Sequence, residues 1–240
     1  MLFRSGVLTI SQSSRRDILD ATGIDEKRIR VAYCGISNRF SSIPSEAEVS
    51  EVLARLKVPR PYVLAIAGDH GPKKNIENIL RAMAALPGEL RKATLVNVGV
   101  PRYNIEGVRA LIAQLGITDR VRSVGRVSDS DLRALYAGAR LTAYPSLYEG
   151  FGFPIVESMA LGTPVVTSNV SSMPEVGGDA SLLVDPHNVD QLSAAIASLL
   201  SDDELHARLR ERGVVQAKRF SWDKAARVAR EFFAELAERP

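Results

Sequence analysis

The sequence has few of the features that mark secreted, metal-binding or nucleic-acid-binding proteins. Its 240 residues include one cysteine, Cys34, so no internal disulfide can form and a reducing compartment is expected. The three histidines show no metal-ligand spacing, so no metal is predicted. With 31 basic and 28 acidic residues the net charge is only +3, which argues against nucleic acid as a partner.

A membrane-spanning or secreted chain is not indicated either. No apolar run approaches the roughly 20 residues of a transmembrane helix. The start, Met1–Gly6, has one basic residue and almost no apolar stretch, unlike a secretory signal. Because Met-Leu-Phe-Arg-Ser also matches the translation of a common sequencing adapter, we expect that Met1 is not the native start. The chain is predicted to be cytoplasmic, with a peripheral contact to the inner membrane face left open because net charge hides basic patches.

Short β-rich runs alternate with longer helical patterns along the chain. Strands are predicted at residues 7–11, 29–32, 62–67, 93–99, 121–124, 141–144, 164–167 and 181–184. Helices are predicted at 13–22, 47–56, 75–86, 105–114, 129–137, 153–161, 188–200, 203–218 and 221–237. From Tyr62 onward the alternation predicts an α/β fold, a doubly wound parallel sheet of Rossmann-like type. Such sheets bind ligands beyond the carboxyl ends of their strands, near the point where strand order reverses.

The first 40 residues differ from the rest. Residues 7–22 predict one strand and one helix, which are too little to bury a core of their own. Residues 31–37 have the composition of a turn-rich connector, and a boundary is predicted near 41–44. We therefore expect residues 1–40 to be the remnant of a preceding domain with its connector, and residues 41–240 to form a complete Rossmann-like domain.

The segment Pro145–Glu157 carries the strongest chemical pattern. It follows a predicted strand, and its glycine-rich turn lets the backbone approach a ligand closely. Pro154 suits the first turn of a helix, whose unpaired N–H groups and positive dipole end favour a diphosphate. Glu149 and Glu157 stand eight residues apart, and each carboxylate can accept hydrogen bonds from two adjacent sugar hydroxyls. Taken alone, the pair and the turn are also explained as an ordinary helix start.

The complete string resembles glycosyltransferase family 4, whose retaining enzymes have the two-domain GT-B fold. The family pattern is Pro-Ser-x-x-Glu-Gly-Phe-Gly-x-Pro-x-x-Glu-x-Met-Ala-x-Gly-x-Pro-Val. The matching positions are Pro145, Ser146, Glu149, Gly150, Phe151, Gly152, Pro154, Glu157, Met159, Ala160, Gly162, Pro164 and Val165. Ser158 replaces the more usual alanine, and the resemblance extends from about Val7 to Trp222. It implies the C-terminal half of a GT-B glycosyltransferase.

The resemblance implies roles for the residues of this motif. Glu149 is expected to be catalytic and to orient hydroxyls of the donor sugar, while Glu157 is expected to bind the ribose. The remaining donor-binding residues of the turn are Gly150, Phe151, Gly152 and Phe153. The N–H groups around Phe151–Gly152 would hold the diphosphate. The last predicted helix would cross back to the amino-terminal domain, which would explain an apolar stripe at Val228, Phe232, Phe233 and Leu236.

A second element is the loop Gly68-Asp69-His70-Gly71-Pro72-Lys73-Lys74-Asn75, in which Asn75 is the predicted helix N-cap. An isolated lysine pair is more typical of a solvated basic loop. In the family a lysine just before this helix contacts the phosphates, so Lys74 is implied as a catalytic residue, with Lys73 and Gly68 as donor-binding residues. Asp69 stands where many members have arginine, and Lys73-Lys74-Asn75 resembles the mannosyltransferase-like variant.

Two further helix starts lie at the same predicted sheet edge. Family positions matching Gly125, Arg126 and Val127 surround the nucleobase, and Ser128 is the predicted cap of the helix that follows. Asp129-Ser130-Asp131 has the form of an Asp-x-Asp metal motif, but acids are expected in a first helical turn. Ser171–Glu175 fits either a lining of the sugar pocket or an ordinary helix start.

The implied function is retaining transfer of a sugar, with mannose first, from a nucleotide diphosphate sugar to an unknown acceptor in polysaccharide biosynthesis. GDP-mannose is the favoured donor and a UDP-sugar the second; the nucleotide sugar is a substrate, and no cofactor is expected. A glycan or lipid-linked acceptor would bind the amino-terminal domain, which is almost absent. The isolated chain is therefore expected to bind nucleotide but to transfer sugar poorly.

Two other functions remain as alternatives. A non-catalytic nucleotide-sugar-binding module would keep the fold and lose the chemistry, but the intact set of Glu149, Glu157 and Lys74 argues against it. Another GT-B enzyme, such as an epimerase or a phosphorylase, would share the architecture. The glycine-phenylalanine-glycine turn fits family 4 better, and no pyridoxal lysine is evident.

Overall fold

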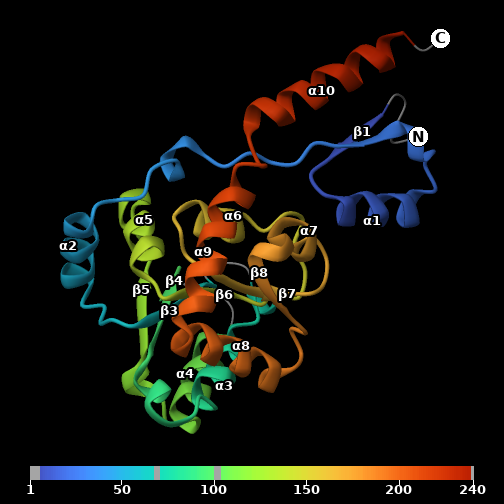
Figure 1. The fold of residues 1–240 in the computed structure, drawn as a ribbon. Coiled ribbons are helices and arrows are strands. Elements are labelled where there is room, and N and C mark those ends of the chain that lie inside the picture. Colours follow the sequence, from blue (N-terminus) through green and yellow to red (C-terminus); the bar gives the residue numbers. More distant parts are fainter. Residues whose placement is uncertain (1–5, 68–70, 100–103, 239–240) are drawn as a thin grey trace.

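The computed structural model describes residues 6–67, 71–99 and 104–238 (Figure 1). The strands are β1 Val7–Thr9, β2 Ile29–Val31, β3 Tyr62–Ile66, β4 Thr94–Val98, β5 Val121–Gly125, β6 Leu141–Tyr144, β7 Val165–Ser168 and β8 Ser181–Val184. The helices are α1 Gln12–Thr22, α2 Glu46–Leu56, α3 Ile76–Ala84, α4 Ile105–Gln114, α5 Asp129–Gly138, α6 Phe153–Ala160, α7 Met173–Gly177, α8 Val189–Ser201, α9 Asp203–Ala217 and α10 Trp222–Ala237. Each predicted strand and helix is present, with ends that differ by at most two residues.

Six parallel strands form the main sheet, in the order β5-β4-β3-β6-β7-β8. Successive side chains of a strand point to opposite faces, and in β3 these alternate between two apolar clusters. Val63 and Ala65 join the cluster under α3, α4 and α8, whereas Tyr62 and Leu64 join the cluster under α2 and α5. Both faces are therefore covered, and the prediction of an α/β doubly wound sheet is confirmed.

The strand order reverses beside β3. The chain passes from β3 outward to β4 and β5 and then returns to β6 on the other side of β3. Ligands of such sheets bind beyond the carboxyl ends of the strands at this reversal. The loop after β3 carries Lys73 and Lys74, and the loop after β6 carries Glu149. The topology thus brings the two predicted catalytic segments to one place.

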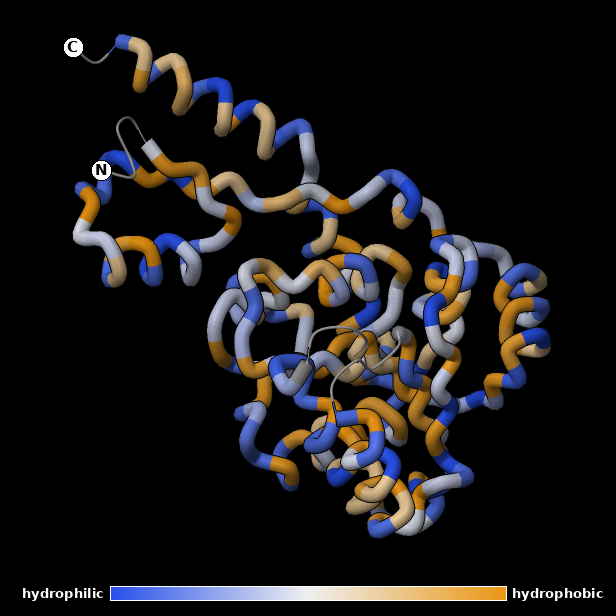
Figure 2. Tube along the Cα trace, turned by 180° about the vertical axis from the view of Figure 1, so that it is seen from behind, coloured by the Kyte–Doolittle hydropathy of each residue, from blue (hydrophilic) through white to orange (hydrophobic). Residues whose placement is uncertain are grey.

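The amino-terminal segment forms a separate two-stranded parallel sheet of β1 and β2. In Figure 1 this sheet lies with α1 and α10 apart from the main sheet. Figure 2 shows that α10 combines hydrophobic and hydrophilic turns. Phe232 is only 1% exposed and lies under the guanidinium of Arg30, but Phe233 is 59% exposed. The predicted apolar stripe of the last helix is therefore only partly covered.

Candidate functional site

A cavity of about 800 Å³ lies at the strand-order reversal. Within the described residues it is lined by Ile10, Ile66, Lys73, Lys74, Val98, Gly99, Arg126, Tyr144, Tyr148, Glu149, Gly150, Phe151, Gly152, Phe153 and Pro154. Both predicted catalytic residues and the whole predicted diphosphate turn are among them. The cavity is large enough for a nucleotide-sized ligand.

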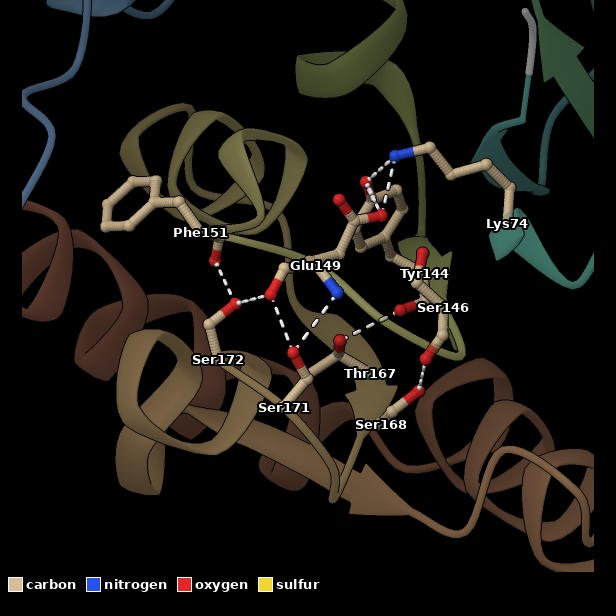
Figure 3. Close-up of polar contacts among 9 residues, drawn as sticks. All are labelled: Lys74, Tyr144, Ser146, Glu149, Phe151, Thr167, Ser168, Ser171 and Ser172. Carbon is tan, nitrogen blue, oxygen red and sulfur yellow. Dashed lines mark hydrogen bonds and ion pairs between the residues drawn. The ribbon is translucent and has the colours of Figure 1, made fainter. Parts of the chain in front are cut away.

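Three polar side chains meet at the wall of this cavity (Figure 3). The Lys74 Nζ lies 2.6 Å from Oε1 of Glu149, and the two side chains are only 10% and 17% exposed. The hydroxyl of Tyr144 donates to the same Oε1 at 2.7 Å and accepts a hydrogen bond from the Lys74 ammonium. Burial, followed by the charge of Glu149, raises the pKa of Tyr144, so its hydroxyl stays protonated and donates. A cation, a neutral donor and an anion are thus held in contact.

The backbone of Glu149 is fixed by two serines that precede α7 (Figure 3). The Ser171 hydroxyl donates to the Glu149 carbonyl at 2.6 Å and accepts from its N–H at 3.2 Å. The Ser172 hydroxyl donates at 3.0 Å to the carbonyls of both Glu149 and Phe151. These bonds occupy the backbone groups and leave the carboxylate of Glu149 to face the cavity.

Side-chain hydrogen bonds to backbone carbonyls also join the end of β6 to β7. The Thr167 hydroxyl donates to the carbonyl of Tyr144 at 2.8 Å, and the Ser168 hydroxyl donates to the carbonyl of Ser146 at 2.5 Å. All four residues are buried. Tyr144 is therefore held through its backbone as well as through its ring, which fixes the position of its hydroxyl.

Asn75 occupies the predicted N-cap position of α3, but its side chain does not cap the helix. Its amide nitrogen donates instead to the carbonyls of Pro145 and Pro186, at 3.0 and 2.7 Å. The predicted N-cap position is therefore confirmed, whereas the side chain joins two loops at the sheet edge instead of capping the helix. The carbonyl of Lys73 also accepts from the N–H of Leu147 at 2.8 Å, so the lysine loop and the motif loop are directly joined.

The predicted diphosphate-binding turn, Gly150 to Phe153, has the local geometry that its sequence predicts. Gly152 is the N-cap of α6 with φ of 97°, a conformation that favours glycine. Pro154 follows within the first turn, where its missing N–H removes no helical hydrogen bond. The first N–H groups of a helix have no intrahelical partner, and α6 has no acidic residue in its first turn. This end of the cavity is therefore suited to an anion.

Glu157 stands on α6 but is not among the described residues that line the cavity. Its Oε2 accepts a hydrogen bond from the hydroxyl of Tyr136 at 2.9 Å. Burial raises the pKa of the Glu157 carboxyl, and the bond from Tyr136 offsets part of that rise. Ribose binding by Glu157 stays a prediction, which requires a nucleotide to reach this carboxylate.

The other predicted donor residues divide into three groups. Lys73 and Arg126 line the cavity, and the Lys73 ammonium lies 5.6 Å from the ring centre of Tyr148. Gly125 ends β5 with φ of 69°, while the Val127 side chain packs in the apolar cluster under α2 and α5. Gly68 lies outside the described residues.

The Asp-x-Asp segment has structural partners. Asp129 pairs with Arg39, and Asp131 lies 2.5 Å from Arg55. The Ser128 hydroxyl caps α5 as predicted, accepting from the N–H of Asp131. In the described part of the chain, no three His, Cys, Asp or Glu side chains are grouped to hold a metal ion. The same residues include no helix that is long and apolar enough to cross a membrane.

Sequence reasoning missed Tyr144 and Tyr136, and it left Ser171 and Ser172 open between a pocket lining and a helix start without assigning their contacts. Tyr144 and Tyr136 each donate to one glutamate of the motif, and Ser171 and Ser172 hold the backbone of Glu149. A signal for Tyr144 was present, because it is the last residue of a strand that leads directly into the motif. The other three come from α5 and the loop before α7, and their approach to the motif has no local pattern.

Comparison with known proteins shows the family of this chain. The family model described as "Glycosyl transferases group 1" matches residues 53–216. The "O-antigen chain mannosyltransferase B" of Escherichia coli is 40% identical over 220 residues, which cover 90% of this chain and 57% of that protein. The "MMP alpha-(1->4)-mannosyltransferase" of Mycolicibacterium hassiacum is 35% identical over 228 residues, covering 92% of this chain and 51% of that protein. The chain therefore spans about half the length of these curated relatives.

Solved structures share the fold. A glycosyltransferase from Rickettsia africae superposes with a TM-score of 0.87 at 21% identity, covering 98% of this chain and 64% of the other. Anabaena Alr3699/HepE, in complex with UDP-glucose, gives a TM-score of 0.84 at 23% identity, with the same two coverages of 98% and 64%. These structures have the GT-B fold. The chain thus has the predicted α/β fold of the C-terminal half of a GT-B protein, and it belongs to the group 1 glycosyl transferases.

Proposed function

We propose that this chain is the donor-binding part of a retaining glycosyltransferase that uses a nucleotide diphosphate sugar. The observation that carries the proposal is the contact of Lys74, Tyr144 and Glu149 in the cavity that also receives the start of α6. A cation and unpaired N–H groups suit a diphosphate, and a fixed carboxylate suits sugar hydroxyls. The donor spans both features, with its diphosphate at the turn and its sugar at Glu149.

In the proposed reaction the bond between the sugar C1 and the diphosphate oxygen breaks, and a bond from C1 to an acceptor hydroxyl oxygen forms on the same face. The diphosphate leaves with the electron pair, and the hydroxyl proton passes to it or to solvent. Lys74, Lys73 and the N–H groups around Phe151–Gly152 stabilise the charge on the leaving group. Glu149 orients the sugar hydroxyls, Arg126 lies at the nucleobase end, and no covalent sugar–enzyme bond is invoked.

The Lys74–Glu149 ion pair has a consequence for donor binding. A diphosphate that binds Lys74 competes with Glu149 for the same ammonium, whose Nζ has three protons to share. Tyr144 contacts both side chains, so it keeps them in place while the ion pair adjusts. We therefore expect the donor to rearrange the Lys74, Tyr144 and Glu149 side chains only slightly.

GDP-mannose is the proposed donor and a UDP-sugar the second. Support for mannose comes from the curated relatives named as mannosyltransferases, at 40% and 35% identity. The sugar would be passed to a glycan or lipid-linked acceptor in polysaccharide biosynthesis. We place the donor domain at residues 41–240 and the connector and remnant of the acceptor domain at 1–40. On this division the chain alone binds donor and transfers poorly, and the whole enzyme works in the cytoplasm, with peripheral contact to the inner membrane face as a further proposal.

A thermal-shift panel of GDP-mannose, UDP-glucose, GMP and UMP tests this function. At about 100 times its Kd a ligand adds about 2.7 kcal/mol of stability, which corresponds to a rise in Tm of roughly 5–10 °C for a chain of this size. We expect this rise with GDP-mannose for the wild type and, at the same ligand concentration, about half of it or less for Lys74→Ala, as a Kd at least about tenfold higher implies. The proposal would be contradicted if none of the four nucleotides changed the melting temperature of the wild type.

A further inference from the structure

The carboxylate of Glu175, on α7, holds the start of α1 from the other end of the sequence. Its Oε2 accepts from the N–H of Gln12 at 2.9 Å, and its Oε1 accepts from the N–H of Ser13 at 3.0 Å. The hydroxyl of Tyr33 donates to Oε2 at 2.8 Å. Burial, followed by the contact with Glu175, raises the pKa of Tyr33 to about 12, so this donor stays protonated at neutral pH. One carboxylate therefore receives three hydrogen bonds from the amino-terminal segment.

The start of α1 needs such a partner. The first N–H groups of a helix lack intrahelical acceptors and carry the positive end of its dipole. Helix α1 has no acidic residue in its first turn, and its N-cap, Ser11, satisfies only the N–H of Ser14. Glu175 supplies both the missing acceptors and the missing negative charge. The contact is thus specific to a carboxylate.

Held in this place, α1 positions two residues that form one wall of the donor cavity, Ile10 and Tyr148. Ile10 lines the cavity, and a Cβ at Gly150 would lie 3.3 Å from Cδ1 of Ile10. On the second turn of α1, Asp17 accepts a hydrogen bond from the hydroxyl of Tyr148 at 2.5 Å. Tyr148 also lines the cavity, with the Lys73 ammonium 5.6 Å from its ring centre.

This wall belongs to one end of the cavity. Its members adjoin Glu149, Gly150 and Lys73, which are the residues proposed for the sugar and the diphosphate. The residues proposed for the nucleobase follow β5 instead. A displaced α1 would therefore alter the sugar–diphosphate end of the cavity and leave the nucleoside end intact.

We infer that Glu175 is a positioning residue for the donor: by binding the start of α1, it holds Ile10 and the Asp17–Tyr148 pair against the sugar–diphosphate end of the cavity. The inference rests on the proposed function and adds a residue to it that does not touch the donor. Glu175→Gln keeps the shape of the side chain, but it removes the charge and turns an NH₂ group toward a backbone N–H. At least one of the two helix-start bonds is then lost.

The test compares nucleotide-sugar affinity with nucleotide affinity on the 240-residue chain. Loss of one hydrogen bond to a charged group changes an equilibrium constant by roughly tenfold. Isothermal titration should show the Kd of GDP-mannose rising about tenfold in Glu175→Gln, and the Kd of GMP should stay near its wild-type value. Tyr33→Phe, which removes one of the three donors, should give a smaller rise. The control is Glu211→Gln on the exposed face of α9, which should change neither affinity.

A loss shared equally by GDP-mannose and GMP would show a general folding defect and overturn the positioning role, as would unchanged affinities. A second measurement does not depend on any ligand. Hydrogen exchange of the peptide covering Gln12 and Ser13 should be faster in Glu175→Gln and unaltered in Glu211→Gln. If the wild type binds none of the nucleotides tested, the proposed donor role fails while exchange still decides whether Glu175 holds α1. Equal exchange in all variants would overturn that contact.

Discussion

Glu149 and Glu157 belong to one motif, and each accepts a hydrogen bond from a tyrosine hydroxyl, yet they lie in different surroundings. Tyr144 donates to Glu149 at 2.7 Å, and Tyr136 donates to Glu157 at 2.9 Å. Glu149 lines the cavity, and its Oε1 lies 2.6 Å from the Nζ of Lys74. Glu157 takes part in none of the ion pairs found among the described residues, and burial raises its pKa.

The comparison shows that two residues of the same type in one motif can have different roles. Lys74 offsets the charge of Glu149, so this carboxylate can remain at a cavity wall where little water reaches it. Glu157 accepts a hydrogen bond from a neutral hydroxyl, and the attraction of Arg39 is smaller than the effect of burial, so its ionised form is costly in the absence of a ligand. Substitutions at the first position should therefore affect chemistry, and those at the second should affect stability.

The largest expected effect comes from Glu149→Gln. Glutamine keeps the shape but removes the charge beside Lys74, and its NH₂ group would meet another donor. In an enzyme that carries its amino-terminal half, release of GDP from GDP-mannose in the presence of acceptor should fall by about 100-fold or more, as for other lost electrostatic contacts. Near wild-type turnover would remove Glu149 from the catalytic set.

A matched pair of tyrosine variants sharpens the comparison. Tyr144→Phe removes a donor from the cavity cluster, and we expect a weaker Kd for GDP-mannose by roughly tenfold. Tyr136→Phe leaves the buried charge of Glu157 without its donor, and we expect a loss of about 1–3 kcal/mol in unfolding free energy. Titration calorimetry and urea unfolding of both variants measure the two effects. The reverse pattern would show that the two carboxylates have exchanged roles.

The smallest expected effect is the pH dependence contributed by Glu157. Because the folded-state pKa is raised, the folded chain binds more protons than the unfolded chain between the ordinary carboxyl pKa and the raised value. This contribution therefore lowers stability as the pH rises through that window. Glu157→Gln removes it, so the variant should melt slightly higher than wild type at pH 7, with the gap closing near pH 4. A gap that is constant with pH would show that titration of Glu157 is not its cause.

Much of the fold could be predicted from the sequence because its signals are local. Short apolar, β-rich runs between longer helical patterns predicted the strands, as with the continuous apolar run at residues 62–67, which forms β3. Asp129 and Asp131 were also correctly interpreted as features of a helix start, since both stand in the first turn of α5. Local chemistry was sufficient in these cases.

The contacts that build the site were not predictable in the same way. Asn75 occupies the predicted N-cap position of α3, but its amide nitrogen donates to carbonyls of two distant loops, and its side chain makes no capping bond. Glu175 was interpreted as an acid in a first helical turn or as a pocket lining, whereas its partners are the N–H groups of Gln12 and Ser13. Such bonds join segments that are far apart in the sequence, and no periodicity within a single sequence predicts them.

The central claim is that Lys74, beside Tyr144 and Glu149, binds the diphosphate of a nucleotide sugar. Titration calorimetry of GDP-mannose against the wild type and Lys74→Ala tests it most directly. Loss of a charged contact predicts a Kd at least about tenfold higher in the variant, with GDP itself weakened to the same extent because both ligands carry the diphosphate. Equal affinity of the two proteins for GDP-mannose would contradict the account.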